Sequence, residues 1–438
     1  MEQPSMLTLR TGSATLIFFA LAIAAWLLAT PSNEGRVLSF SLLAGGLFGV
    51  LLQRSRFCFF CVSRDFIERR DPRGLLGILA ALAVGTLGYH AAFGAFLPDP
   101  ASGRLPPDAH IGPLSWVLAL GATLFGLGMA ISGSCISAHL YRLGEGALAS
   151  VIALIGALIG FFLGFLCWNT LYLASIQEAP VIWLPAQLGY GGSLLLQLAV
   201  LGGLAHLLLR YRKHDEPGQP ANRSLKNVSE AASARQKQAK KRSVQAVHEH
   251  FEPVFNAAMA TQVVFQRPAN SLRQLLFGAR WLTWVGGALI GTLALASYLR
   301  VGPLGVTAEL GSLSRTAANG LGWLPERLEG LDGFSGCATV VKETLLSNNG
   351  LFILGLVFAA WASALLAGDC APRWPNAREA LRNLVGGILL GWGGMLALGC
   401  TVGTLLSGIM AGAVSGWLFA VFCFIGLIAG LRLRRVIG

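Results

Sequence analysis

Charged residues are scarce in this sequence. Only 12% of its 438 residues are Asp, Glu, Lys or Arg, whereas soluble globular proteins carry about 25%. Hydrophobic residues make up 54% of the chain, and the mean hydropathy is +0.62. This balance excludes a soluble globular protein and indicates a membrane protein.

Long apolar runs recur along the chain, each near the roughly 20 residues that a helix needs to cross a bilayer. They lie near residues 12–30, 37–53, 74–97, 114–134, 147–174, 187–209, 281–299, 350–367, 384–399 and 412–431. We therefore expect an all-α polytopic protein with about ten spans, several of them interrupted by glycine. The first run resembles a secretory signal, but so many spans follow it that we interpret it as a retained helix.

Acidic residues are missing from the interior of these runs, so the sequence offers no evident proton or sodium coupling site and favours facilitated passage. Basic residues are nearly absent from 98–110 and 175–186, and acids outnumber them in 301–348. They gather instead in 53–73, in 211–279 and in the C-terminal RLRR. Because cytoplasmic loops carry the excess of Lys and Arg, we expect both termini in the cytoplasm.

The formal charge of +12 is thus mainly a topology signal, and we expect no nucleic-acid partner. The segment 211–279 holds eleven Lys or Arg against five Asp or Glu. We interpret it as a flexible cytoplasmic linker, with contact to anionic lipid or a partner as the alternative. The predicted order is an N-terminal helix over 1–35, a first repeat over 36–210, the linker over 211–279 and a second, inverted repeat over 280–438.

Cysteine is also sparse, and three of the eight cysteines share a lead-in. LFG at 47–49, LFG at 124–126 and LLG at 389–391 are followed, after eight intervening residues, by Cys58, Cys135 and Cys400. A fourth run, LIG at 289–291, reaches Arg300 at that spacing and continues as GPLGVT over 302–307. The pattern predicts four copies of one unit, one of which has lost its cysteine.

Topology gives these copies opposite directions. The helices before Cys58 and Cys135 are expected to run inward and those before Arg300 and Cys400 outward, so the two halves form an inverted repeat. Such repeats build transporters whose substrate sites lie where discontinuous helices meet.

The helix breaks are predicted at SGSC over 132–135 and ALGCTVG over 397–403. Gly133 and Gly399 let the backbone turn there, and Ser134 or Thr401 can cap the helix that restarts. A restarted helix presents N–H groups and a positive dipole end, which suit a small anion. In the copy without cysteine, we assign Gly302, Gly305 and Thr307 to the same pathway.

A thiol in an apolar pocket stays protonated, because burial opposes the thiolate. It then acts as a weak, polarizable donor and acceptor, which fits a soft sulfur-bearing anion better than sulfate or phosphate. Membrane cysteines are often only small apolar fillers, but the shared offset argues otherwise for these three. Cys58 and Cys61 also form a C-x-x-C, which leaves thiol–disulfide exchange open as an alternative.

Three stretches carry a family resemblance. LFGVLLQRSRFCFFCVSRD (47–65), SGSCISAHLYRLGEG (132–146) and LGCTVGTLLSG (398–408) resemble the cysteine motifs of the YeeE/YedE family of bacterial inner-membrane transporters. The likeness extends from about residue 36 to the C-terminus, apart from the basic segment.

The resemblance implies a multi-pass inner-membrane protein that imports thiosulfate, or in some members a selenium species. It implies that Cys58, Cys135 and Cys400 pass the substrate along a narrow waist by weak hydrogen bonds to their thiols. It further implies cytoplasmic sulfur-relay proteins as partners, no cofactor or metal, and transport rather than catalysis. Cys61, His139 and the long 211–279 segment depart from the family's usual pattern.

Five further residues are secondary candidates. Arg64 and Asp65 are expected to pair near the cytoplasmic mouth. Arg142 and Glu145 follow Cys135 and are expected to neutralise each other, which lowers the cost of charge near the membrane. His139 is interpreted as a satisfied polar residue, with pH-sensitive transport as the alternative.

Three classes of function remain distinct at this point. The first is a transporter or channel for a small sulfur anion, and the sequence favours it. The second is a membrane sulfurtransferase or redox enzyme that uses Cys58 or Cys61. The third is a structural or sensing membrane protein whose basic segment is the working part.

Overall fold

The structure is a computed structural model that describes residues 4–29, 33–211, 280–325, 327–331, 340–342, 344 and 346–437. The predicted linker therefore lies outside the described residues, apart from Tyr211. Met1–Tyr211 and Arg280–Gly438 form one compact unit, and the fold below is that of this unit. The division of the chain into repeats at 36–210 and 280–438 stays a prediction.

Regular structure in the described residues is helical, with only isolated bridges outside the helices. The elements are α1 (Pro4–Ala29), α2 (Asn33–Ser55), α3 (Phe59–Arg69), α4 (Arg73–Phe96), α5 (Trp116–Ser132), α6 (Ile136–Gly144), α7 (Ala149–Leu171), η1 (Tyr172–Ile176), α8 (Leu184–Arg210), α11 (Thr283–Arg300), α12 (Thr307–Gly320), α13 (Asn348–Ala367), α14 (Ala377–Leu396), η4 (Thr401–Ser407), α15 (Gly408–Met410) and α16 (Val414–Ile437). η1 and η4 are π-helical. Each of the ten predicted apolar runs corresponds to one of the long helices.

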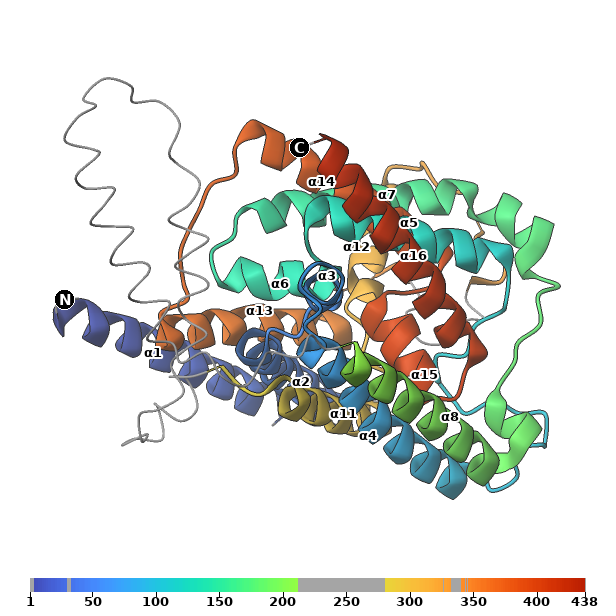
Figure 1. The fold of residues 1–438 in the computed structure, drawn as a ribbon. Helices are drawn as coiled ribbons and strands as arrows, with labels where there is room; N and C mark the ends of the chain where they lie inside the picture. Colours follow the sequence, from blue (N-terminus) through green and yellow to red (C-terminus); the bar gives the residue numbers. More distant parts are fainter. Residues whose placement is uncertain are drawn as a thin grey trace. The chain divides into compact units, whose positions relative to one another are not determined.

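One arrangement occurs four times: a long helix, a break, a short element and a second long helix. The four units are α2–α3–α4, α5–α6–α7, α11–α12–α13 and α14–η4/α15–α16. Figure 1 shows the short helices α3 and α12 among the long ones. The four predicted copies therefore correspond to four structural units.

The units pack crosswise. In the first and third units, α2 lies against α13 and α4 against α11; in the second and fourth, α5 lies against α16 and α7 against α14. In each pair of units, the first long helix of one unit packs against the last long helix of the other, and this holds for both units of the pair. The first long helices of the second and fourth units, α5 and α14, also lie against each other.

Glycines bring the crosswise helices into backbone contact. A Cβ atom on Gly49, Gly287, Gly126 or Gly391 would collide with a carbonyl of the partner helix. Small residues at helix crossings are typical of membrane bundles, where close packing replaces the hydrophobic drive between helices. The sequence's high glycine content is explained largely in this way.

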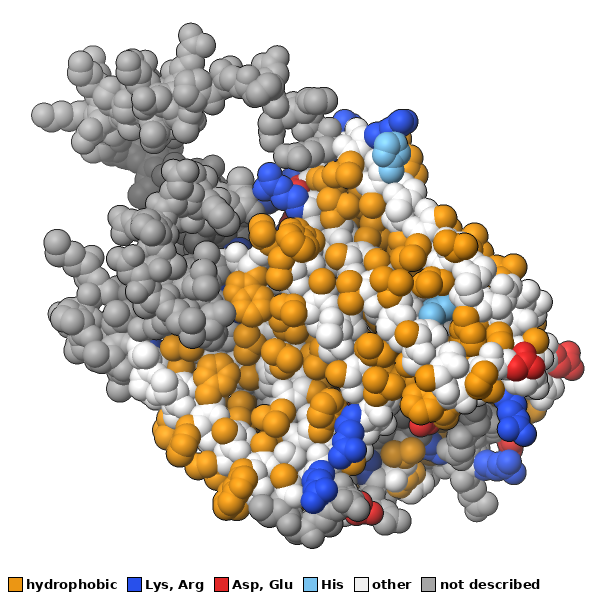
Figure 2. Space-filling view, turned by 90° about the horizontal axis from the view of Figure 1, so that it is seen from below, with side chains coloured by type: hydrophobic (Ala, Val, Ile, Leu, Met, Phe, Trp, Pro, Cys, Tyr) orange, Lys and Arg blue, Asp and Glu red, His pale blue; other side chains and the backbone are white. Residues whose placement is uncertain are grey.

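The outer surface is apolar, as the membrane assignment requires. Leu16, Phe19, Trp26 and Leu195 are each at least 65% exposed, and they lie on α1 and α8. The face in Figure 2 is mainly hydrophobic, with Lys and Arg side chains near its edges. Exposed apolar area on this scale marks a lipid-facing surface.

Eight described helices are long and apolar enough to cross a membrane, or nine if the bent pair of α14 with η4 and α15 is one span. That pair bends by 41° at its break. The predicted run at 281–299 forms α11, which is 18 residues long and ends in Arg300; it falls outside this count. The chain is an all-α polytopic membrane protein.

The packing predicts opposite effects for two glycine-to-alanine changes. Gly391→Ala places a methyl group on the Ala157 carbonyl of α7, so we expect a loss of about 1–3 kcal/mol in stability from overpacking. Gly202→Ala, on the exposed part of α8, meets nothing within 4 Å. It should be neutral or stabilising, because alanine favours the helix. Thermal midpoints of the two purified variants measure the difference, and equal midpoints would contradict the packing.

Candidate functional site

Each of the four breaks contains a residue with positive φ. These are Arg56 (φ 49°), Gly133 (φ 84°), Gly302 (φ 146°) and, in the fourth unit, Leu398 (φ 53°) followed by Gly399 (φ 152°). Non-glycine residues rarely adopt this region, and strain of this kind gathers at functional sites. The predicted turns at Gly133 and Gly399 are confirmed, and Arg56 supplies the turn of the first unit without a glycine.

The three repeat cysteines occupy the same position in their units. Cys58, Cys135 and Cys400 are the N-cap residues of α3, α6 and η4, and all three are buried. The prediction that Ser134 or Thr401 caps the restarted helix is wrong. In the second unit the N-cap residue is Cys135, one residue after Ser134. In the fourth unit it is Cys400, and Thr401 is already the first residue of η4.

The unit without a cysteine has a longer break than its sequence suggested. Arg300 is the last residue of α11 and is exposed, whereas α12 begins six residues after Val301, at Thr307. Val306 is the N-cap, so Thr307 rather than Arg300 lies where the restarted helix begins. Gly305 is buried in this break.

The breaks bring the cysteines together in two groups. Cys58 is in side-chain contact with both Cys135 and Cys61, which joins the first and second units. Cys400 lies beside Thr307, which joins the fourth unit to the third. Cys135 is also close enough to Cys400 for the two to interact electrostatically. All seven cysteines in the described part of the chain are free thiols.

Buried hydroxyl groups without a hydrogen-bond partner lie on two of the short helices. The Oγ atoms of Ser63 on α3 and Ser137 on α6 are buried and make no hydrogen bond to the described protein. An unpaired buried hydroxyl costs about 1–3 kcal/mol. Both lie within five residues of a cysteine N-cap, so the breaks retain unused hydrogen-bonding capacity.

Comparison with known proteins assigns this arrangement to a family. A family model described as Sulphur transport matches residues 54–429, which include all four breaks. The chain belongs to the Sulphur transport family. The resemblance to YeeE/YedE proteins is thereby confirmed.

Curated relatives of this Sulphur transport protein are transporters by name. Two are named thiosulfate transporter TsuA: that of Escherichia coli (strain K12) is 24% identical over 88% of this chain and 91% of its own length. That of Spirochaeta thermophila is 26% identical over 88% of this chain and 95% of its own length. The probable transporter YedE of Escherichia coli (strain K12) is 34% identical, over 19% of this chain and 21% of its own length.

In this family member, Arg142 and Glu145 do not neutralise each other directly, and that prediction is wrong. Arg142 donates hydrogen bonds to Gly133 O, to Ser134 Oγ and to Cys61 Sγ. Glu145 instead accepts a hydrogen bond from Gln53 Nε2 at 3.4 Å. Helical side chains point back toward the N-terminus, so Arg142 reaches the break before its own helix rather than the C-cap residue Glu145.

The remaining secondary candidates have local partners. Arg64 pairs with Asp65 at 2.9 Å, as expected, and both side chains are about one-third exposed. Nδ1 of the buried His139 contacts Ser150 Oγ at 3.3 Å. Among the described residues, no group of three or more His, Cys, Asp or Glu side chains is placed to hold a metal ion.

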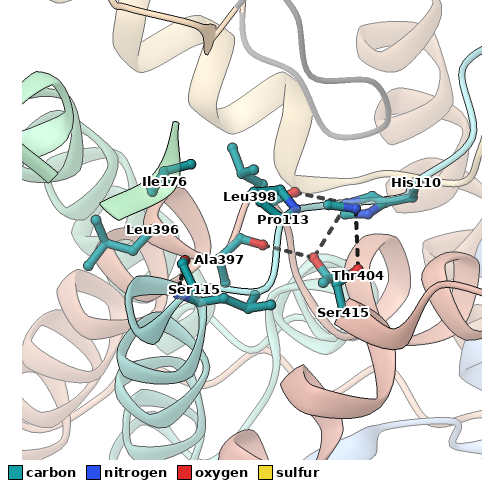
Figure 3. A pocket seen from close by; sticks show the side chains of 11 residues that line it. His110, Pro113, Ser115, Ile176, Leu396, Ala397, Leu398, Thr404 and Ser415 are labelled. Atoms are coloured by element: carbon teal, nitrogen blue, oxygen red, sulfur yellow. Dashed lines mark hydrogen bonds between the residues drawn. The ribbon is translucent and has the colours of Figure 1, made fainter. Parts of the chain in front are cut away.

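His110 supports the fourth break, and the sequence analysis did not single it out. Figure 3 shows its ring between Leu398 and Thr404, beside a small cavity. Nε2 donates to Leu398 O at 2.9 Å and lies 3.4 Å from Thr404 Oγ1, which itself donates to Ala397 O. His110 thus holds the strained turn that precedes Cys400. Its position in the polar loop 98–110, 288 residues from Leu398, gave no signal of this contact.

A buried acid was also missed. Glu309 on α12 pairs with Lys342 and accepts a hydrogen bond from Ser347 Oγ at 3.0 Å; both charged side chains are less than 10% exposed. The pair neutralises the carboxylate, so Glu309 fixes the segment 340–342 to α12. It does not supply a free charge beside Thr307.

Because the folded protein buries His110, its pKa lies below the usual value of 6.5. As pH falls below that value, the unfolded chain takes up a proton that the folded protein does not, so stability decreases. We expect the thermal midpoint of the parent to fall more between about pH 7.5 and pH 5.5 than that of His110→Gln, whose amide donates but does not titrate. His110→Ala should be less stable than the parent by about 1 kcal/mol at pH 7.5, and by less at pH 5.5, because alanine does not titrate either. Equal pH dependence in parent and His110→Gln would contradict this role.

Proposed function

We propose that this chain imports a small sulfur-containing anion, thiosulfate before others, through the bacterial inner membrane along Cys58, Cys135 and Cys400. The observation that carries the proposal is the common position of the three thiols. Each caps a short element at a break inside the bundle, and Cys58 and Cys135 are in contact across two units.

The chemistry of these breaks suits such a substrate. Protonated thiols are weak donors and acceptors, so they can exchange hydrogen bonds with the terminal sulfur of thiosulfate without holding it tightly. The N-termini of the short elements favour negative charge. The unpaired hydroxyl of Ser137 adds a donor near Cys135, and the hydroxyl of Thr307 lies beside Cys400.

The relatives support the same substrate class, because two relatives that this chain matches over most of their length are named thiosulfate transporters. We further propose that both termini face the cytoplasm, as the distribution of Lys and Arg favours. A cytoplasmic sulfur-relay protein then receives the imported anion. Selenium compounds are the alternative substrates within this class.

A membrane sulfurtransferase is the second candidate function, and one observation favours it. The thiols of Cys58 and Cys61 are in contact, as a C-x-x-C redox pair would be. Such an enzyme would carry a persulfide or mixed disulfide on one of the two sulfurs during turnover.

The proposal predicts the loss of uptake in two variants. Cys135→Ala and Cys400→Ala remove a thiol from the path, and each should reduce thiosulfate uptake by about a hundredfold if the lost contact is worth 2–3 kcal/mol in the rate-limiting step. Growth on thiosulfate as the sole sulfur source, in a bacterium without its own sulfate and thiosulfate importers, provides the measurement. Initial uptake rates at equal membrane abundance quantify it.

Cys167→Ala is the matched control, because Cys167 lies in α7 away from the breaks and should leave uptake unchanged. A well-expressed parent that fails to grow would contradict thiosulfate as the substrate and direct the assay to selenium species. Mass spectrometry of Cys58 and Cys61 during turnover separates the two functions, since a transporter leaves both thiols unmodified.

A further inference from the structure

Arg142 places a cation directly at the cysteine group. Its guanidinium donates to Cys61 Sγ at 3.2 Å and to Gly133 O at 3.2 Å. Cys61 in turn contacts Cys58. A positive charge therefore lies one side chain away from the thiol pair that joins the first two units.

The charge of Arg142 has no carboxylate within ion-pair distance among the described residues. Its hydrogen-bond acceptors are the Gly133 carbonyl, the Cys61 thiol and the hydroxyl groups of Ser134 and Tyr141, all of them neutral. Glu145 acts on it electrostatically, but that carboxylate is bound to Gln53. Holding a charge in an apolar environment is costly without a counter-ion.

A second arginine approaches the same turn. Arg434 on α16 lies close to Gly133 and donates to Ala130 O at 3.5 Å. By contrast, Arg64 and Arg435 are each paired with an acid, Asp65 and Glu68. Two arginines thus approach the Gly133 turn, and neither forms an ion pair there; Glu68 and Glu379 act on Arg434 only at longer range.

We propose that Arg142 and Cys61 form a second anion subsite, which binds the oxyanion end of the substrate while Cys58 and Cys135 contact its sulfur end. The inference rests on the proposed function, since it assigns a role within that path. Thiosulfate has two chemically different ends, a sulfonate-like group with three oxygens and a terminal sulfur. A guanidinium matches the first by its planar fork of donors, and a thiol matches the second.

The arrangement leaves Arg142 available to a ligand. Its side chain is half-buried, and its hydrogen bonds with Gly133 O, Ser134 Oγ, Cys61 Sγ and the Tyr141 side chain leave at least one of its five N–H donors unused. The contacts with Gly133 O and Ser134 Oγ fix the direction of the guanidinium. A fixed, partly satisfied cation is well suited to bind an anion that must also leave.

The first test measures the local charge at Cys61 without reference to transport. In purified protein, Cys61 is alkylated with iodoacetate, which is negative, and with iodoacetamide, which is neutral, and mass spectrometry reads each rate. Arg142→Gln should lower the ratio of the iodoacetate rate to the iodoacetamide rate by about threefold or more, because the attraction of the guanidinium is lost. In the parent, thiosulfate should slow both reactions.

The second test uses proteoliposomes and radiolabelled thiosulfate. Arg142→Gln should raise KM by about tenfold or more, since a hydrogen bond to a charged group is lost. Arg142→Lys should give an intermediate KM, because it keeps the charge but not the fork of donors. Arg373→Gln is the control, as Arg373 is exposed and pairs with Glu379 at 2.7 Å away from the breaks.

The two assays separate the two proposals. An unchanged alkylation ratio in Arg142→Gln, or alkylation of Cys61 that thiosulfate does not slow, overturns the subsite even where uptake proceeds. A parent that takes up no thiosulfate overturns the proposed substrate. In that case two measurements at Cys61 still decide whether the subsite binds an anion. They are the ratio of the iodoacetate rate to the iodoacetamide rate, and the slowing of alkylation by selenite or sulfite in place of thiosulfate.

Discussion

Backbone that leaves the helix inside an apolar bundle must find its hydrogen bonds within the protein, and the rest of this structure depends on that constraint. Side chains hold a carbonyl in three of the four breaks. Arg142 and Ser134 bind Gly133 O, Ser297 binds Gly302 O, and His110 binds Leu398 O. Ser407 of the fourth unit also reaches Leu304 O in the third. The breaks at Gly133 and Gly302 are thus held by nearby side chains, whereas the fourth break depends on contacts with segments far away in the chain.

The restarted helices are capped less well than the carbonyls of these three breaks are held. Where serine or threonine would cap a helix well, three units have cysteine, whose sulfur is a poor acceptor. Only Cys400 accepts a backbone N–H, from Val402 at 3.4 Å, while Cys58 and Cys135 make no such cap. Weak capping leaves the N-terminal groups of these elements with spare capacity for a transient ligand. A strong cap would occupy it permanently.

The sequence predicts well what local spacing determines. The motif of a glycine followed, after eight residues, by a cysteine marks two features at once. Its glycine, Gly126 or Gly391, packs against a neighbouring helix, and its cysteine, Cys135 or Cys400, follows the break. Contacts across hundreds of residues leave no such mark. His110 and Leu398 are 288 positions apart, and Glu309 finds Lys342 only once α12 is placed. The left-handed turn at Arg56 was equally hidden, since arginine carries no preference for it.

The error over Arg142 is instructive about charge in membranes. Arg142 and Glu145 both follow Cys135 and were expected to neutralise each other, and the buried thiols were expected to suit a soft anion without help from a basic residue. In the structure, Arg142 donates hydrogen bonds to Gly133 O and Cys61 Sγ, so its guanidinium lies beside the Cys61 thiol. The two groups of the inverted repeat then differ: Cys58 and Cys135 have a guanidinium nearby, whereas Cys400 and Thr307 are supported by His110, whose pKa is lowered by burial and which is therefore neutral at physiological pH. On the path that we propose, an anion would meet a positive group beside Cys58 and Cys135 and a neutral group beside Cys400 and Thr307. The guanidinium of Arg142 would therefore favour the anion at the first group over the second.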